Sequence, residues 1–205
     1  MKEDRRDYTK GVLKIEDLQG DPLTTVQQWI DRAKSNELDP TAFVLSTSVE
    51  GQPHSRVVLL KEIRNGQLVF FTNYNSDKGK EIAQNPKVSL NFFIPSDERQ
   101  IRILGTASKV SEEESDEYFY SRPYESQVGA AVSRQSETLD SRDRLDAAYE
   151  SALKLEQNPK RPDHWGGYAI TPFQIEFWQG RASRLHDRFL FTFIDGEWQI
   201  NRLYP

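Results

Sequence analysis

The sequence predicts a mainly β protein with helices in its connections (α+β), in which one antiparallel sheet closes on itself as a barrel. Two observations support this fold class. Most apolar segments after Thr41 follow the two-residue period of strands, and turn residues such as Asn65-Gly66 join them in hairpin order. The segments between them carry helix caps, and no linker is long enough to separate two domains. We therefore expect a single domain over residues 21–205, preceded by a flexible polar arm over residues 1–20.

The first helix is predicted from its start signal. Asp21 is a good N-cap and Pro22 suits the first helical position, because its missing N–H would have no partner there. The helix is expected to stop near Asn36, before Asp39-Pro40. Its apolar residues recur at helical spacing and predict one buried stripe, made of Leu23, Val26, Ile30 and Ala33.

The middle of the chain alternates strands with one short helix. Asn65-Gly66 lies between two apolar runs and is the strongest hairpin signal in the sequence. Ser76 is the expected cap of the short helix. The expected order is strands over residues 42–48, 54–63 and 67–73, a helix over 76–84, and strands over 87–94 and 100–110.

Two further helices and a return to strands are predicted for the rest of the chain. Ser111 and Glu114 form a capping box for an acidic helix that Arg122-Pro123 ends. The next helix is expected over residues 141–157, with a buried face made of Leu145, Ala148, Ala152 and Leu155. The final strands are expected over residues 165–172, 174–180, 187–194 and 197–203, the last two joined by Asp195-Gly196.

Composition excludes several functional classes. The chain has 205 residues, 36% of them hydrophobic, which is enough for a sizeable core. It has no cysteine, and therefore no disulfide or thiolate metal site, which together with the absence of a signal-peptide or membrane segment predicts a cytoplasmic protein. The formal net charge of −5 argues against nucleic-acid binding. Any anion must therefore be bound by a local cluster of cations.

The run from Ile175 to Phe189 is the densest cluster of candidate ligand-binding residues. If the chain after Gly180 is a strand, Arg184, His186 and Arg188 project from one face, because side chains alternate with period two. Such a face suits an anionic or planar ligand, and Trp178 can form a wall against a flat ring. The alternative is that the arginines are solvated or paired with distant acids and that the tryptophan belongs to the core.

Cations elsewhere suggest anion sites. Arg56 and Lys61 are an odd number of residues apart and so belong to opposite faces of a regular strand, whose centre (residues 57–60) is apolar on both faces and is expected to be covered on both. Lys78 lies in the first turn of a helix, where free N–H groups and the helix dipole favour a phosphate. The segment 121–136 supplies Arg122, Ser126, Gln135 and Ser136, whose donors suit phosphate oxygens, although a helix-ending loop explains them equally well.

Other catalytic signatures are missing from the sequence. His54, His164 and His186 have no ligand-spaced partners, so no metal site is predicted. The sequence contains no dinucleotide-binding glycine loop, no Walker loop and no nucleophile elbow. A reaction carried by a bound cofactor is therefore favoured over covalent catalysis by the protein.

One stretch resembles a known family. The pattern Glu176-Phe177-Trp178-Gln179, four residues, then Arg184-Leu185-His186-Asp187-Arg188 is similar to the C-terminal motif of the pyridoxamine 5'-phosphate oxidases, and the similarity extends from Arg5 to Pro205. The resemblance implies a split β-barrel, FMN as cofactor and a homodimer. It also implies oxidation of pyridoxamine or pyridoxine 5'-phosphate to pyridoxal 5'-phosphate, with dioxygen as acceptor and hydrogen peroxide and ammonia as by-products.

The resemblance also assigns roles to individual residues. The positions it implies for FMN are Arg56, Val57, Val58, Leu59, Leu60, Lys61, Phe71, Thr72, Lys78, Gln100, Gln135, Ser136, Trp178 and Arg188. The positions it implies for the substrate are Arg5, Tyr8, Lys61, Tyr118, Arg122, Ser126, Arg184 and His186, with Arg184 and His186 at the reacting end and Arg5 and Tyr8 in an N-terminal lid. Asp77 departs from the family pattern, since many members have a basic residue there.

Two alternatives remain at this point. One is a different flavin-barrel oxidoreductase, which would need Arg56, Lys78 and Trp178 but not Tyr118, Arg122 or Arg184. The other is a non-enzymatic protein that binds flavin or pyridoxal phosphate.

Overall fold

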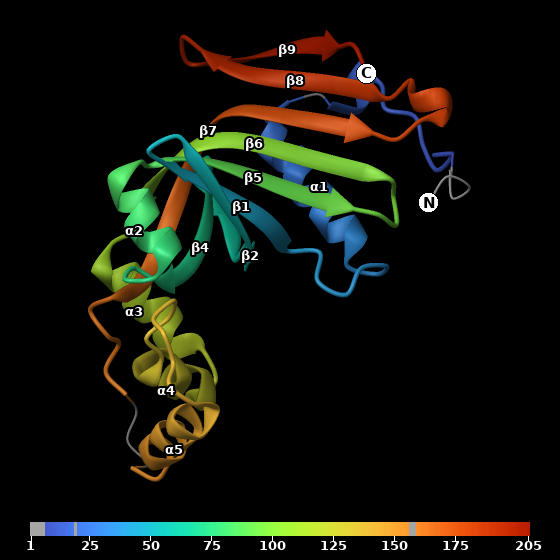
Figure 1. Cartoon of the computed structure of the whole chain (residues 1–205). Coiled ribbons are helices and arrows are strands. Elements are labelled where there is room, and N and C mark those ends of the chain that lie inside the picture. Colours follow the sequence, from blue (N-terminus) through green and yellow to red (C-terminus); the bar gives the residue numbers. More distant parts are fainter. Residues whose placement is uncertain (1–6, 19, 156–158) are drawn as a thin grey trace.

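The structure is a computed structural model that describes residues 7–18, 20–155 and 159–205. Figure 1 shows one large twisted sheet, with α1 against one part of it and α3, α4 and α5 gathered beyond another. The strands are β1 (Ala42–Val49), β2 (Gln52–Leu59), β3 (Glu62–Arg64), β4 (Gln67–Asn73), β5 (Lys87–Ile94), β6 (Arg99–Lys109), β7 (Trp165–Gln179), β8 (Asp187–Ile194) and β9 (Glu197–Leu203). The α-helices are α1 (Pro22–Ala33), α2 (Asp77–Gln84), α3 (Glu112–Ser121), α4 (Tyr124–Val132) and α5 (Arg142–Leu153), with short 3-10 turns at Ile15–Leu18 and Ala182–Arg184.

The strands form one antiparallel sheet that bends back on itself. Its order is β2-β1-β5-β6-β7-β4-β3, with β8 and β9 added beside β7. The two ends of this path, β2 and β3, are consecutive in sequence and are joined only by Leu60 and Lys61. The Leu60 N–H donates to Thr41 O and the Lys61 N–H to Val69 O, at 2.9 Å each, so the chain crosses between the two edges. The expected barrel that is split along one side is confirmed.

Strand β7 connects the barrel to a C-terminal extension. Its first part pairs with β4 (Leu68 with Ile170 through Asn73 with Trp165), and its second part pairs with β8 (Gln174 with Thr192 through Gln179 with Asp187). Strand β6 pairs with β7 along almost its whole length. The sequence predicted two strands over residues 165–180, and this was wrong: they form one strand that continues through an irregularity opposite Gly105.

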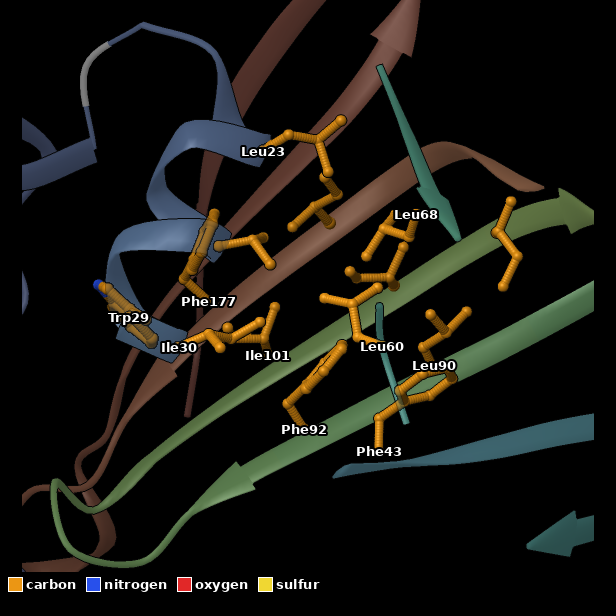
Figure 2. Packing of buried hydrophobic residues seen from close by; sticks show 14 of the residues in the cluster. Leu23, Trp29, Ile30, Phe43, Leu60, Leu68, Leu90, Phe92, Ile101 and Phe177 are labelled. Atoms are coloured by element: carbon orange, nitrogen blue, oxygen red, sulfur yellow. The ribbon is translucent and has the colours of Figure 1, made fainter. Parts of the chain in front are cut away.

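The core fills the barrel and the space under α1. The apolar stripe expected on α1 is confirmed, since Leu23, Val26, Ile30 and Ala33 are all buried. Figure 2 shows Trp29 and Ile30 of this helix packed against Phe177 and Ile101 of the sheet, with Phe43 and Phe92 further along the barrel. The Trp29 and Phe177 rings lie 5.1 Å apart in an edge-to-face arrangement, which adds to the stabilisation from burial.

Local start and turn signals agree with the structure. Asp21 caps α1, Ser76 caps α2, and Ser111 forms the capping box of α3. Asn65 and Gly66 have φ values of 49° and 74°, so both adopt the left-handed conformation that a two-residue hairpin requires. Asp195 and Gly196 do the same between β8 and β9, with φ values of 51° and 90°.

The predicted strand over residues 54–63 is interrupted. It divides into β2 and β3 because the chain exchanges its pairing partner at Leu60 and Lys61. The expectation that residues 57–60 are covered on both faces is also wrong within this chain: Leu60 is buried in the core, but Val57 is 65% exposed.

The helical region contains two further differences from the sequence prediction. Residues 124–132 were expected to be part of a loop but form α4. The helix begins directly after Pro123, and the fixed φ of proline is compatible with a helix start. Helix α5 ends at Leu153 rather than at residue 157, and none of its residues is buried, so its predicted buried face is absent. The reason is its position: α5 packs along α4 at the periphery and not on the sheet, as Figure 1 shows.

The described part of the N-terminal segment contacts the sheet. Leu13 and Leu18 belong to the core, and the Leu13 N–H donates to Asp187 Oδ2 at 3.1 Å. The boundary proposed at residue 20 stays a prediction. Within the described residues, no helix has the length and apolarity to cross a membrane, and no three potential metal ligands gather together.

Candidate active site

The N-terminus of α2 forms a compact polar site. Ser76 caps the helix with its hydroxyl group, which accepts a backbone N–H. Lys78 is only 8% exposed, and its Nζ donates to Ser76 Oγ and Gln135 Oε1 at 3.2 Å each. Burial lowers the pKa of Lys78, and the positive charge of Arg56 lowers it further. A cation kept partly dehydrated beside another cation favours an anionic ligand.

Arg56 faces this polar site from β2. Its guanidinium donates to Thr47 Oγ1 and to Glu81 Oε2, at 2.7 Å each. Burial opposes ionisation of Glu81, but hydrogen bonds from Thr47 and Arg56 and the charge of Arg56 outweigh it, so the pKa of Glu81 is lowered. The adjoining cavity of about 450 Å³, here named the α2 cavity, is lined by Arg56, Val57, Asp77, Lys78, Gln135 and Ser136, among others.

A second cavity lies between the barrel and α3. This α3 cavity has a volume of about 460 Å³, and its lining includes Lys61, Thr72, Tyr118, Arg122, Ser126 and Gln135. Gln135 lines both cavities, so they adjoin. The Phe71 and Tyr118 rings stack at 4.0 Å and form an aromatic wall. Lys61 lines the α3 cavity and a smaller cavity beside it, whereas Arg56 lines the α2 cavity. Lys61 lies after the end of β2, so the predicted placement of both residues on one regular strand was wrong.

Arg122 and Lys61 are the cationic side chains in the lining of the α3 cavity. Burial lowers the pKa of the Arg122 guanidinium. One of its nitrogens, NH1, is buried and has no hydrogen-bond partner among the described residues. A buried donor without a partner is costly, so this side chain is prepared for an acceptor that the chain itself does not supply.

The C-terminal cluster is built by a turn and not by a strand. The prediction that Arg184, His186 and Arg188 alternate along one strand face was wrong, because residues 182–184 form a 3-10 turn and β8 begins only at Asp187. The convergence of the first two residues nevertheless holds. Arg184 and His186 line one cavity of about 810 Å³, the turn cavity, together with Tyr8 and Trp178.

His186 is held in a defined orientation in the turn cavity. Its ring lies 4.6 Å from Trp178 and 5.8 Å from Tyr8. Nδ1 accepts the Arg181 backbone N–H at 3.1 Å, so the neutral ring carries its proton on Nε2. Burial lowers the pKa of His186, and the positive charges of Arg184 and Arg188 lower it further, which keeps the ring neutral near pH 7.

Arg188 and Gln100 lie beside Trp178 in the sheet. Trp178 is paired with Gln100 on β6 and with Arg188 on β8. The Arg188 guanidinium donates to Glu176 Oε1 at 2.8 Å and to Tyr204 O at 3.0 Å, and the hydrogen bond with Glu176 raises its pKa. Arg188 thus pairs with an acid of the sheet, and its assignment to FMN stays a prediction.

The candidate residues thus divide into two groups within one chain. Trp165, which lines the α3 cavity, is the first residue of β7, and Trp178, which lines the turn cavity, is near its end. Because a strand rises by about 3.3 Å per residue, these two residues are roughly 40 Å apart along β7. Figure 1 shows the β7–β8 turn on the side of the molecule away from α3 and α4. Arg5 lies outside the described residues, and Val58, Leu59 and Leu60 contribute to the strand and the core.

Several residues that line the cavities were not singled out from the sequence, and two of them bear on the arginines. Trp165 lines the α3 cavity and Glu81 fixes Arg56. Glu81 lies three residues after Lys78, on the same face of α2, which was the available signal. Trp165 begins an apolar strand and carries no local signal that distinguishes it from a core residue.

Comparisons with known proteins agree across the chain. A family model described as "Pyridoxamine 5'-phosphate oxidase" matches residues 31–155, and one described as "Pyridoxine 5'-phosphate oxidase C-terminal dimerisation region" matches residues 165–205. The pyridoxine/pyridoxamine 5'-phosphate oxidase of Bacteroides thetaiotaomicron is 51% identical, over 98% of this chain and 97% of that protein. The protein of the same name from Actinobacillus pleuropneumoniae is 48% identical, over 98% and 97%.

Solved structures resemble the fold in the same way. PhzG from Burkholderia lata, in complex with tetrahydrophenazine-1-carboxylic acid, matches with a TM-score of 0.89 and 28% identity, over 95% of this chain and 98% of that chain. A pyridoxamine 5'-phosphate oxidase-related, FMN binding protein from Nostoc punctiforme matches with a TM-score of 0.76, over 92% of this chain and 100% of that chain; at 17% identity this shows the fold alone.

Proposed function

The chain belongs to the pyridoxamine 5'-phosphate oxidase family, and we propose that it oxidises pyridoxamine 5'-phosphate and pyridoxine 5'-phosphate to pyridoxal 5'-phosphate with FMN as cofactor. This proposal rests on one observation: the α2 and α3 cavities adjoin, and each contains candidate anion-binding residues. The α2 cavity contains Lys78 and Arg56, and the α3 cavity contains Arg122. A reaction between a flavin mononucleotide and a phosphorylated substrate requires two phosphate sites side by side.

The α2 cavity has the donor set that the FMN phosphate requires. Lys78 and Arg56 supply charge, Ser136 supplies a hydroxyl group, and the first turn of α2 supplies backbone N–H groups. These groups suit a single terminal phosphate, so FMN and not FAD is expected, bound without a covalent link. When bound, FMN accepts hydride from the substrate carbon and passes the electrons to dioxygen, giving hydrogen peroxide.

The α3 cavity suits the substrate phosphate. The Nη1 atom of Arg122 is buried and has no hydrogen-bond partner among the described residues, so it can donate to a phosphate oxygen. Tyr118, Ser126 and Lys61 line the same cavity and provide further donors. Oxidation of the substrate CH–NH₂ carbon gives an imine, which water converts to the aldehyde with release of ammonia. The alcohol substrate gives the aldehyde directly.

Arg184 and His186 are proposed to orient the reacting end of the substrate. Arginine keeps its proton at neutral pH and cannot act as a base, so Arg184 contributes position and charge. His186 presents its Nε2–H as a donor. Tyr8 packs edge-on to Trp178 at 5.6 Å, which supports a covering role for the N-terminal segment, in which Arg5 is also placed by the family resemblance.

A homodimer is proposed because the two groups of residues lie at opposite ends of β7. In a dimer with two-fold symmetry, the turn cavity of one subunit can complete the α2 and α3 cavities of its partner. The match of residues 165–205 to a dimerisation region supports this arrangement. Several exposed apolar side chains, including Val57 and Phe93, are also consistent with a face covered by a second copy.

The function is tested on the purified protein by its absorbance spectrum and its products. We expect a flavin spectrum, FMN as the chromophore released by heat, and formation of pyridoxal 5'-phosphate with consumption of one dioxygen per turnover. Unphosphorylated pyridoxine should react far more slowly because it leaves Arg122 without a partner. A colourless protein, or one that releases FAD or oxidises the unphosphorylated compound equally well, would refute the proposal.

A further inference from the structure

The surroundings of the Arg122 guanidinium differ from those of Arg56 and Arg188. The Arg56 guanidinium is held by Glu81 at 2.7 Å and that of Arg188 by Glu176 at 2.8 Å. Arg122 makes no ion pair with any residue that the structure describes. Its guanidinium carbon instead lies 4.7 Å from the centre of the Trp165 ring.

An aromatic partner leaves the charge of an arginine uncompensated. A carboxylate orients a guanidinium but cancels much of its field, whereas the face of an indole ring attracts the cation through its quadrupole and carries no net charge. A guanidinium oriented by an indole ring therefore offers its full charge to a ligand. This matches a cavity that must hold a phosphate ester carrying up to two negative charges.

Trp165 is itself fixed from two sides. Its carbonyl accepts a hydrogen bond from Arg161 NH1 at 2.7 Å, and Arg161 Nε donates to Asp116 of α3 at 2.5 Å. Its ring stacks on Phe71 with the centroids 5.7 Å apart and the planes at 14°. The buried Arg161 thus ties the start of β7 to α3, the helix that precedes Arg122.

We infer that Trp165 is a positioning residue for substrate phosphate binding: its ring holds the Arg122 guanidinium toward the α3 cavity, and Arg161 holds Trp165 in place. The inference rests on the proposed function, because it uses the assignment of Arg122 to the substrate phosphate. Trp165 acts through Arg122 and carries no chemical step.

The first test compares substrate kinetics of the holoenzyme and its variants. In Trp165→Leu, the KM for pyridoxine 5'-phosphate should rise about 3- to 30-fold, the range expected for loss of a cation–π contact, while kcat and FMN content stay within about twofold. Trp165→Phe keeps an aromatic face and should recover part of the loss. A fall in kcat with KM unchanged would overturn the inference.

The matched control is Trp29→Leu. Trp29 is also buried and lies 4.3 Å from an arginine, Arg99, but it packs between α1 and the sheet and lines none of the three cavities. Trp29→Leu should lower thermal stability and leave KM unchanged. If it raises KM as much as Trp165→Leu does, the effect of Trp165 is general loss of packing and the inference fails.

A double-mutant cycle separates positioning from other roles. In an Arg122→Ala background, Trp165→Leu should raise KM no further, because the residue through which it acts is gone. If the two substitutions raise KM by the product of their separate effects, the inference is overturned. If Trp165→Leu does not fold, the same cycle is measured with Trp165→Phe, which keeps most of the side-chain volume.

The cycle also distinguishes this inference from the proposed function. It is repeated with the dissociation constant of pyridoxal 5'-phosphate for the holoenzyme in place of KM. A wild-type protein that binds this ligand but oxidises neither phosphate ester refutes the function while the cycle still decides the role of Trp165. A wild-type protein that binds no phosphorylated pyridine refutes both.

Discussion

Arg184 has a backbone conformation that few non-glycine residues adopt. Its φ is 63° and that of Ser183 is 57°, so both lie in the left-handed region. Such conformations cost free energy and persist where the surrounding structure requires them, often at functional sites. This turn places Arg184 in the lining of the cavity that His186 and Trp178 also line. The extended strand expected from the sequence would have given Arg184 a different backbone conformation.

Arg184→Ala should lower turnover by at least about tenfold, the value of one lost charge-assisted contact, without changing flavin content or thermal stability. Arg184→Lys should recover only part, because a point charge does not reproduce the planar fork of donors. Turnover and flavin content are measured on the same preparations. Wild-type turnover in Arg184→Ala would remove this residue from the site.

Arg122→Ala should weaken binding of the phosphorylated substrate by about 2 kcal/mol or more, because a charge-assisted contact to phosphate is lost. The affinity for FMN should change little, since Arg122 lines the α3 cavity and not the α2 cavity. Equilibrium titration of each ligand checks this. Equal weakening of both ligands would show that the residue serves the FMN phosphate.

The titration of His186 follows from its surroundings. Burial and the nearby arginines place its pKa below the ordinary value of 6.5. The neutral ring is therefore favoured in the folded state, and its contribution to stability is present above pH 6.5 and is lost as the pH falls through the lowered pKa. NMR titration of the apoprotein should give a midpoint below 6.5, and Arg184→Ala should move it upward. A downward or absent shift would contradict the proximity of the two charges.

Helix α2 depends on a glycine at its first turn. A Cβ atom on Gly79 would lie 2.1 Å from the Tyr74 carbonyl oxygen, so no other residue fits without moving the helix. Because Lys78 is the neighbouring residue, the position of its ammonium group depends on this contact. The fit of α2 against the preceding loop thus sets the geometry of the α2 cavity.

Gly79→Ala should destabilise the fold by about 1–3 kcal/mol through overpacking and should weaken FMN binding. Gly129→Ala in α4 is the matched control, since a Cβ there meets nothing closer than Tyr149 at 3.9 Å. That change should stabilise the protein by about 0.5–1 kcal/mol because alanine is the better helix former. Chemical denaturation and flavin fluorescence measure both effects. Equal effects of the two changes would contradict the close approach.

At the scale of the whole molecule, the length of β7 separates the halves of the site. One end carries Trp165 and the α3 cavity, and the other carries Trp178 and the turn cavity. A continuous strand of this length holds its two ends far apart, because each residue adds about 3.3 Å. This geometry supports the proposal of a site shared between two copies of the chain.

Mixed dimers test the shared site. Arg122→Ala and Arg184→Ala subunits are unfolded together, refolded and compared with each variant refolded separately. Activity is measured at a substrate concentration well below KM, where each variant alone should keep at most about a tenth of wild-type activity. Random pairing makes half of the dimers mixed, each with one intact site, so about a quarter of wild-type activity should return. No recovery, despite mixed dimers detected by mass spectrometry, would place both arginines in the site of one chain.

The sequence by itself determined the elements whose causes are local. The caps Asp21, Ser76 and Ser111 fix helix starts because their side chains bond N–H groups two or three residues away. Asn65-Gly66 fixes a hairpin because these residues accept positive φ. The sequence also offered Lys78 and Arg122 as candidates for anion binding, since phosphate requires cations and N–H donors wherever they are placed; their role stays a prediction.

Only the tertiary structure decided how these parts meet. The break at Leu60 and Lys61 comes from a change of pairing partner between residues far apart in sequence. The position of the Trp165 ring beside Arg122, and the separation of Trp165 from Trp178 along β7, also depend on sheet pairing. Periodicity shows which face of a helix or strand is apolar, but it does not show which other element that face packs against. Long-range contacts form only when the whole sheet closes.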